Sequence, residues 1–227
     1  MGEVKVGRAA FLTTVGVGAL GVLFGGRVTR ALNAPINDVG SVVPSGLKAL
    51  LPTGGWRIYS INPPWPTFHP ATYTLTVSGL VEKPAVLSWD EISKLPAVKQ
   101  ITTFHCVTGW TVGNVHWEGI RLQTLWDIVH PLSTAKYINF VSMEKDYVDT
   151  LSLPQSVLPH VMLAHTMDGK PLLREHGAPL RLIIPEMYGY KNVKWVHKLE
   201  LVPNLHPGFW EQNGYDVDAW VGRSNGY

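Results

Sequence analysis

The stretch TTFHCVTGW, residues 102–110, carries the only cysteine of the chain, Cys106. A lone cysteine forms no disulfide within its own chain, so a function for Cys106 requires its thiol as a nucleophile, a redox group or a metal ligand. β-Branched and aromatic residues over 98–105 predict a strand that leads to Cys106, and Gly109 predicts a turn after it. The alternative is a small buried hydrophobic residue, which on this stretch alone is the commoner case. Residues elsewhere in the chain are needed to distinguish a functional thiol from a buried hydrophobic residue.

The composition describes a globular chain without the features of a nucleic-acid-binding protein. Its 227 residues are 45% hydrophobic and 16% charged, with a formal net charge of +2 and nine tryptophans. A chain of this length can bury a core as one domain. The sequence contains no basic stripe, acidic tail or low-complexity block, so we expect no nucleic-acid partner.

The amino-terminal segment differs from the rest of the chain. Residues 1–8 include Lys5 and Arg8, and no charged residue follows until Arg27. A basic start and an uncharged apolar run predict a signal sequence or membrane anchor over residues 1–30, with export to the periplasm or the outer face of the cytoplasmic membrane. The segment partly resembles a twin-arginine export signal, with Ala9 in place of the second arginine. Whether it is cleaved stays open, and a buried core helix is the less favoured alternative.

Residues 31–70 are rich in Pro, Gly and Asn and predict an extended arm, which precedes a domain of residues 71–227. In that domain a capping box at Ser88 predicts a short helix. A second helix is predicted by an apolar face of Leu122, Leu125, Trp126 and Val129.

Hydrophobic patterning predicts the strands of this domain over residues 73–77, 98–105, 137–143, 161–166, 180–184 and 195–202. Turns are predicted at 116–119 and 168–169. The aromatic tail from His206 onward is expected to pack on the domain. Strands with few, short helices predict an α+β fold with a mixed sheet.

Two turns carry residues suited to binding an anion. In the first, His176 and Arg181 flank a Gly-Ala-Pro turn. In the second, residues 188–194, Lys191 and Lys194 accompany exposed backbone amides. Arginine, lysine and turn amides together suit a phosphate-bearing ligand. The alternatives are solvated lysines and a surface pair of Arg181 with Glu175 or Glu186.

The ordered set of motifs resembles the molybdopterin-binding domain of the sulfite oxidase superfamily, from about Trp56 to Tyr215. The motifs are FHCV at 104–107 with Trp110, WEG at 117–119, AKY at 135–137, DGKPL at 168–172, HGAPLR at 176–181 and YGYK at 188–191 with Lys194 and Trp195. The resemblance implies an α+β domain with mixed sheets and short helices that binds molybdenum as Mo-molybdopterin. The immunoglobulin-like dimerisation domain of sulfite oxidases has no counterpart in this sequence.

The resemblance also implies roles for individual residues. Cys106 would ligate molybdenum, as a soft thiolate suits a redox metal. Tyr215 would be a catalytic residue that donates a hydrogen bond to the oxo group or the substrate. The implied cofactor-binding residues are Asn62, Ser142, His176, Arg181, Asn192, Val193 and Lys194.

The departures from sulfite oxidases concern the substrate. Arginines that bind the sulfite dianion in that family are replaced here by Trp110, Thr111 and Ser60, which removes strong charge-assisted bonds. In this respect the chain is more similar to the periplasmic protein-methionine-sulfoxide reductase branch. The implied function is two-electron oxygen-atom transfer with a small sulfur-containing or sulfoxide substrate.

Three alternatives remain open. They are sulfite-oxidase-type oxidation of a small sulfur compound, a non-catalytic membrane-tethered module, and a thiol hydrolase with Cys106 as nucleophile. His105 is a poor base for the last of these, since adjacent strand residues face opposite sides. The sequence holds no CxxCH motif and no cysteine set for an iron–sulfur cluster, so we expect an external electron-transfer partner, either a haem-bearing membrane subunit or a cytochrome.

Overall fold

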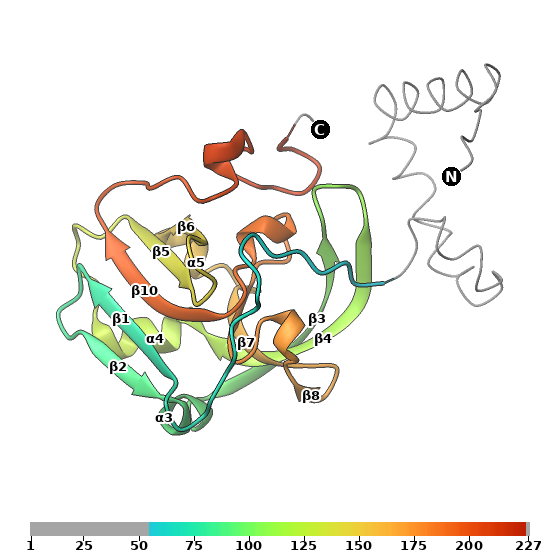
Figure 1. Cartoon of the computed structure of the whole chain (residues 1–227). Helices are drawn as coiled ribbons and strands as arrows, with labels where there is room; N and C mark the ends of the chain where they lie inside the picture. Colours follow the sequence, from blue (N-terminus) through green and yellow to red (C-terminus); the bar gives the residue numbers. More distant parts are fainter. Residues whose placement is uncertain (1–54, 226–227) are drawn as a thin grey trace, which may run out of the picture. The chain divides into compact units, whose positions relative to one another are not determined.

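Two five-stranded sheets form the framework of the computed structural model, in which residues 55–225 are described (Figure 1). In the first sheet the strand order is β2-β1-β10-β5-β6. Strands β1 and β10 pair in parallel and all other pairs of this sheet are antiparallel, so the sheet is mixed. Its strands are β1 (Thr74–Gly79), β2 (Ala85–Ser88), β5 (Tyr137–Ser142), β6 (Val148–Ser152) and β10 (Val196–Val202).

The second sheet is antiparallel, with the order β3-β4-β7-β8 and with β9 paired to β7. Its strands are β3 (Ala97–His105), β4 (Thr111–Arg121), β7 (Met162–Met167), β8 (Lys170–Pro171) and β9 (Arg181–Ile183). Residues 55–107 and those from Thr111 onward belong to one unit, whereas Thr108–Trp110 group outside it and are not placed relative to it. The predicted signal or anchor segment, residues 1–30, and the first part of the predicted arm lie outside the described residues.

The helices of the described part are short, which agrees with the predicted α+β class. They are α3 (Trp89–Ser93), α4 (Leu122–Val129), α5 (Leu153–Ser156) and the 3-10 helices η1 (Arg174–His176), η2 (Gly189–Lys191) and η3 (Glu211–Asn213). The predicted capping box at Ser88 is present, with reciprocal bonds to Glu91. Over residues 55–225, no helix has the length and apolar character that crossing a membrane requires.

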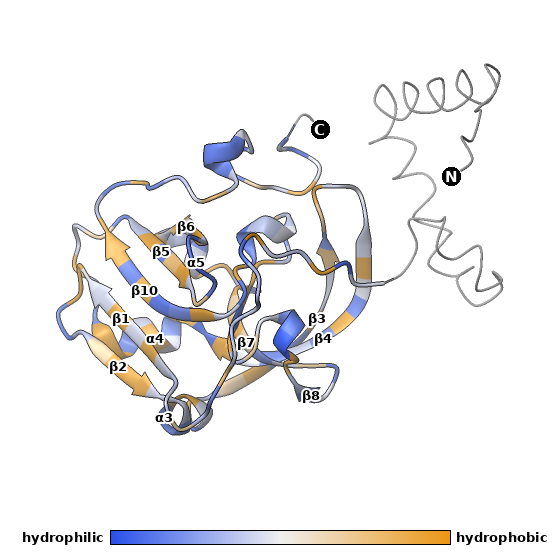
Figure 2. Ribbon diagram, in the orientation of Figure 1, coloured by the Kyte–Doolittle hydropathy of each residue, from blue (hydrophilic) through white to orange (hydrophobic). Residues whose placement is uncertain are grey.

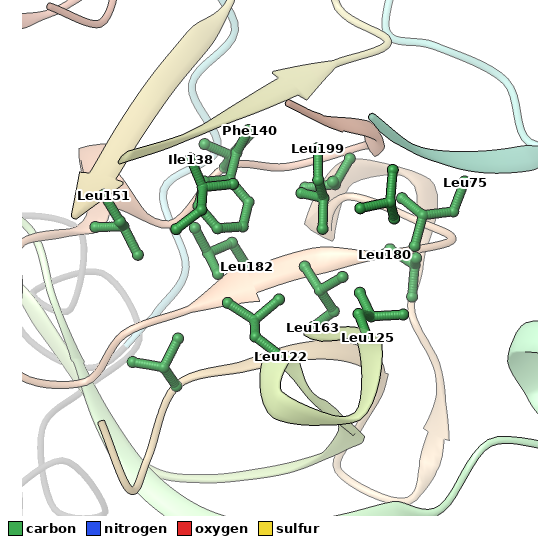
Figure 3. Packing of buried hydrophobic residues seen from close by; sticks show 14 of the residues in the cluster. Leu75, Leu122, Leu125, Ile138, Phe140, Leu151, Leu163, Leu180, Leu182 and Leu199 are labelled. Carbon is green, nitrogen blue, oxygen red and sulfur yellow. The ribbon is translucent and has the colours of Figure 1, made fainter. Parts of the chain in front are cut away.

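The main hydrophobic core lies between the two sheets and is completed by α4 (Figure 3). Ile138 and Phe140 of β5 enter it from one sheet and Leu163 of β7 from the other, while Leu122 and Leu125 bring the apolar face of α4. Strand side chains point alternately to the two faces of a sheet, so each strand carries both hydrophobic and hydrophilic residues (Figure 2).

A second, smaller cluster lies on the other face of the second sheet. Along β7, Met162 and Ala164 belong to this cluster while Leu163 between them faces the main core. Along β9, Leu182 faces the main core and Ile183 the small cluster. By the same alternation the side chain of Arg181 points away from the main core. This second face carries the site described below.

Several local predictions are confirmed, and the prediction of one turn is wrong. The turn at 168–169 joins β7 and β8 with Asp168 at φ 51° and Gly169 at φ 75°, and the tail packs on the core with Ala219 fully buried. Residues 116–119 form no turn but lie within β4. Gly119 permits close strand packing there, since a Cβ atom would approach the carbonyl oxygen of Leu163 to 2.1 Å. Strands β2, β4, β6 and β8 were not among the predicted elements.

Candidate functional site

Arg181 is the centre of the site and lies inside a cage of three aromatic rings. Its guanidinium carbon is 5.4 Å from the ring centroid of Trp56, 5.0 Å from that of Phe104 and 5.7 Å from that of Trp117. Cation–π attraction partly replaces the water that burial removes. Burial nevertheless lowers the pKa of Arg181 to about 10.

The charge of Arg181 has no acidic counterpart among residues 55–225. The predicted alternative, a surface pair with Glu175 or Glu186, is wrong, because the side chain is only 4% exposed and Glu186 pairs with His160 instead. Its Nη1 atom donates to the carbonyl of His176 at 3.3 Å, and its buried Nε atom has no hydrogen-bond partner in the described structure. A buried donor without a partner indicates a place where a ligand can accept.

His176 lies beside Arg181 with a second unpartnered nitrogen. Its ring centroid is 4.9 Å from that of Trp56, and its buried Nδ1 atom makes no hydrogen bond to any described residue. Burial, followed by the charge of Arg181, lowers the pKa of His176, so the imidazole is neutral at neutral pH. It can donate or accept one hydrogen bond without adding charge.

Lys194 brings a second cation to the same place. A Cβ atom on the next residue after His176, Gly177, would approach the Cβ of Lys194 to 2.8 Å, so the glycine lets the two turns pack closely. Burial first, and then the charge of Arg181, lower the pKa of Lys194 to about 7. We call His176, Arg181 and Lys194 the cradle.

The described part of the arm, residues 55–70, contains no helix or strand and passes over the cradle. Trp56 contacts both Phe104, at 4.9 Å between ring centroids, and His176. The carbonyl of Tyr59 accepts a hydrogen bond from Lys194 Nζ at 2.6 Å. The backbone amide of Asn62 donates to Glu144 Oε1 at 3.0 Å. Thus Asn62 contacts the loop that follows β5 directly.

Ser142, at the end of β5, joins this network. Its hydroxyl donates to the carbonyl of Lys194 at 2.8 Å and accepts from the backbone amide of Glu144 at 2.9 Å. Five of the predicted site residues are therefore connected through direct contacts, through the shared neighbour Glu144 and through the packing of Gly177 against Lys194. They are Asn62, Ser142, His176, Arg181 and Lys194.

Cys106 follows the last residue of β3 and is half-buried. Phe104, two residues earlier on the strand, forms one wall of the Arg181 cage. Strand β3 therefore leads directly from the cage to the thiol. Across residues 55–225, no three His, Cys, Asp or Glu side chains are grouped so that they could hold a metal ion by themselves.

Asn192 and Val193 use their polar groups to hold the second turn against β9. Asn192 Oδ1 accepts from the amide of Ile184 at 2.8 Å, and the carbonyl of Val193 accepts from the amide of Leu182 at 2.8 Å. A contact of either residue with a cofactor stays a prediction. Tyr215 packs against the rings of Tyr190 and Trp210 in the tail, and its described contacts do not reach the cradle.

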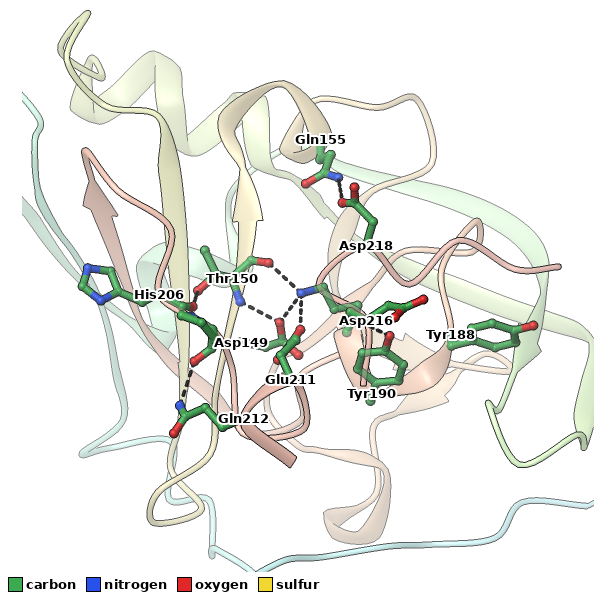
Figure 4. A network of polar contacts seen from close by, with 12 residues as sticks. Asp149, Thr150, Gln155, Tyr188, Tyr190, His206, Glu211, Gln212, Asp216 and Asp218 are labelled. Carbon is green, nitrogen blue, oxygen red and sulfur yellow. Dashed lines mark hydrogen bonds and ion pairs between the residues drawn. The ribbon is translucent and has the colours of Figure 1, made fainter. Parts of the chain in front are cut away.

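The prediction that Lys191 helps to bind an anion is wrong. Its Nζ atom lies 2.6 Å from Asp149 Oδ1 and 2.5 Å from Glu211 Oε1, and it donates to the carbonyl of Thr150 at 2.9 Å (Figure 4). All three charged side chains are at most 2% exposed. The two acidic side chains already occupy this lysine and tie the tail to β6.

Trp56, Trp117 and Glu144 were missed by the sequence reasoning. Aromatic residues are frequent in this chain, so their placement around one arginine leaves no local pattern. Glu144 follows a strand, which is an ordinary position for a solvated acidic residue. The arrangement as a whole offers one buried and one half-buried cation and two unpartnered nitrogens, connected by β3 to the only thiol, which suits an anionic ligand carrying a soft metal.

Comparison with known proteins agrees with this chemistry. The family described as the oxidoreductase molybdopterin binding domain matches residues 62–210. An uncharacterized oxidoreductase of Bacillus subtilis is 33% identical over 150 residues, which are 65% of this chain and 75% of the relative. The catalytic subunit of a protein-methionine-sulfoxide reductase of Campylobacter jejuni is 31% identical over 63% of this chain and 54% of its own length.

A solved structure shares the fold. The sulfane dehydrogenase SoxCD from Paracoccus pantotrophus superposes with a TM-score of 0.57 at 24% identity, over 61% of this chain and 40% of that one. The described chain spans about half the length of the methionine-sulfoxide reductase subunit and less than half of the dehydrogenase.

Proposed function

The chain belongs to the family of oxidoreductase molybdopterin binding domains, and from this premise we propose that it is a molybdenum enzyme that transfers an oxygen atom in a two-electron reaction. The observation that carries the proposal is the cradle, in which the buried Arg181 and the half-buried Lys194 form no salt bridge within the described structure and which β3 joins to the only thiol. An anion bound there would restore the charge balance that burial disturbs.

The residues fit a phosphate-bearing pterin cofactor. Arg181 Nε and His176 Nδ1 are buried atoms that make no hydrogen bond within the described structure, so they can bind a ligand. Lys194 supplies a second positive charge. In the proposed complex these residues, with Asn62, Ser142, Asn192 and Val193 around them, hold the pterin and its phosphate. The Cys106 thiolate holds the metal. When bound, the cofactor supplies the redox-active metal centre at which two electrons and an oxygen atom are exchanged.

The remaining roles belong to the protein. The aromatic cage excludes water from Arg181 and so strengthens its attraction for an anion. The neutral imidazole of His176 orients the pterin through one hydrogen bond. Tyr215 is proposed to orient the substrate by donating from its hydroxyl. This role is supported by the packing of the tail, which holds the Tyr215 ring between Tyr190 and Trp210.

For the substrate we propose a sulfoxide. The 31% identity to a protein named as a methionine-sulfoxide reductase catalytic subunit supports this choice. So does the residue at position 60, where a serine that donates to Glu144 replaces the arginine expected of a sulfite-binding site. A dianion such as sulfite would lack that charge-assisted contact.

The electron partner and the location are also proposals. We propose a separate electron-transfer protein, a haem-bearing membrane subunit or a cytochrome, because the sequence carries no second redox centre. Export to the periplasm or the outer face of the cytoplasmic membrane rests on the signal-like residues 1–30. The amino-terminal sequence of the mature protein would test retention of that segment.

Metal analysis and a paired assay test the proposal as a whole. Protein purified from cells that make the cofactor should contain about one molybdenum per chain, as the single thiol implies. It should oxidise a reduced dye when methionine sulfoxide is added and should turn over sulfite far more slowly. Protein matured with cofactor but free of molybdenum and pterin would refute the enzyme assignment. Faster turnover of sulfite would refute only the substrate.

A further inference from the structure

Glu144 is a buried side chain whose carboxylate hydrogen bonds, within the described residues, all come from the arm. Its side chain lies in the loop after β5 and the residue is 4% exposed. The Oε1 atom accepts from the amide of Ile61 at 2.7 Å, the amide of Asn62 at 3.0 Å and the hydroxyl of Ser60. These donors are more than 80 residues away along the chain, so the contact is tertiary.

The same residue is connected to the cradle through its backbone. The amide of Glu144 donates to Ser142 Oγ, which in turn donates to the carbonyl of Lys194. Lys194 Nζ then donates to the carbonyl of Tyr59, the residue before the Glu144-bound segment. The contacts form a closed circuit between the arm and the cradle.

Beside the aromatic packing of Trp56 and Phe68, side-chain hydrogen bonds from the domain help to place the described part of the arm. Residues 55–70 contribute no strand to either sheet, so no ladder of backbone hydrogen bonds holds them. Beyond the circuit, Arg174 donates to the carbonyls of Trp65 and Pro66, at 3.0 Å for the latter. Among these contacts the three bonds to Glu144 are accepted by a charged group, and such bonds are the stronger kind.

The arm also covers the atoms that the proposed cofactor would use. Trp56 contacts His176 and Arg181, the two residues whose buried nitrogens lack partners in the described structure. A ligand bound at those nitrogens lies next to Trp56. Its departure therefore requires the arm to move.

We propose that Glu144 is a positioning residue that clamps residues 59–62 onto the cradle and thereby controls how long the pterin cofactor is retained. The retention part rests on the proposed function, whereas the clamp itself does not. The negative charge of Glu144 matters because three donors converge on one of its oxygens. A neutral amide accepts the same bonds more weakly.

The clamp can be measured without the cofactor. Arg57 is exposed and lies two residues before the clamped segment 59–62, so the rate of trypsin cleavage between Arg57 and Ile58 reports release of the arm. In full-length protein from a pterin-deficient host, Glu144→Ala should raise the rate of this cleavage by about tenfold, and Glu144→Gln should fall between it and the wild type. The matched control is Glu200→Gln, which removes a half-exposed partner of Lys198 in β10.

The position of the first trypsin cut distinguishes loss of the clamp from general destabilisation of the domain. Loss of the clamp lets the segment around Arg57 leave the domain and be cut, while Lys198, inside the first sheet, stays protected. Simultaneous cleavage at both sites would mean that the substitution unfolds the domain, and the decision would then rest on Glu144→Gln. Wild-type cleavage rates at Arg57 in both variants would overturn the clamp.

The retention part is measured on protein purified with its cofactor. Release of pterin into the filtrate, followed by its fluorescence after oxidation, should be about tenfold faster in Glu144→Ala than in the wild type or Glu200→Gln. Faster cleavage at Arg57 with unchanged pterin release would overturn retention and leave the clamp. A wild type without pterin would refute the proposed function and retention together, while the cleavage result would still decide the clamp.

Discussion

The guanidinium carbon of Arg181 lies 5.0 Å from the ring centroid of Phe104, two residues before Cys106. The same ring lies against η2, where a Cβ atom on Gly189 would approach Phe104 Cζ to 2.2 Å. One aromatic side chain thus joins the strand that carries the thiol, the strand that carries the buried cation and the second turn. Substitutions in any of the three should affect cofactor binding.

Arg181→Ala should lower the molybdenum and pterin content of purified protein by about tenfold or more, because it removes a buried charge that the phosphate needs. Arg181→Lys should recover only part of the loss, since lysine lacks the planar guanidinium that packs in the cage. Elemental analysis and pterin fluorescence are the measurements. Lys198→Ala is the control for loss of a surface lysine. Unchanged molybdenum in Arg181→Ala would contradict the cradle assignment.

Cys106→Ser should separate metal chemistry from pterin binding. A hydroxyl is a far poorer ligand for a redox metal than a thiolate, so activity should fall by about a thousandfold or more while pterin remains bound through the cradle. The measurement is turnover with a reduced dye alongside pterin fluorescence of the same sample. A serine variant with full activity would exclude the ligand role.

The buried cluster around Lys191 should make stability depend on pH. Burial raises the pKa of Asp149 to about 8 from its ordinary value of 3.8, although Lys191 acts in the opposite direction. The folded protein therefore keeps a proton that the unfolded chain releases, and the contribution of Asp149 to the free energy of unfolding decreases as pH rises between those values.

Asp149→Asn isolates this effect, because the amide cannot ionise. The difference in free energy of unfolding between variant and wild type, from urea titrations at pH 5 and pH 8, should shift in favour of the variant at the higher pH. Histidines with lowered pKa values, such as His176, and Lys194 contribute with the opposite sign, but they are present in both proteins and cancel in the difference. A difference that is the same at both pH values would contradict the assignment.

Anion binding to the empty cradle should weaken as pH rises through about 7, because the pKa of Lys194 is lowered to about that value. In cofactor-free protein, inorganic pyrophosphate should therefore bind more tightly at pH 6 than at pH 8 by calorimetry. The ligand also gains charge over this range, so the comparison needs Lys194→Ala, in which the decrease should be smaller. An identical decrease in both proteins would exclude Lys194 as its cause.

Much of the local structure could be predicted from neighbouring residues. The capping box at Ser88 and the apolar face of α4 depend on residues three or four apart, and the Asp168-Gly169 turn depends on two. The family could be predicted from the sequence for a different reason. An ordered set of short motifs is retained over most of the domain, and the family match covers residues 62–210.

Where prediction failed, a distant part of the chain decides the structure. Gly119 suits a turn by its composition but lies in β4, because the backbone of β7 packs against it. Lys191 and Lys194 lie in the same turn and look alike in the sequence, yet Lys191 contacts Asp149 and Glu211 whereas Lys194 contacts the arm. Local sequence carries no information about such partners.

The sequence by itself determined the fold class and the family, because these depend on residue type, order and short spacing. Tertiary structure alone decided which cations remain without an acidic partner, which rings surround Arg181 and which residue holds the arm. The bond between Lys194 and Tyr59 joins residues 135 positions apart. Such contacts arise only when burial forces distant polar groups to satisfy one another, since water no longer does so.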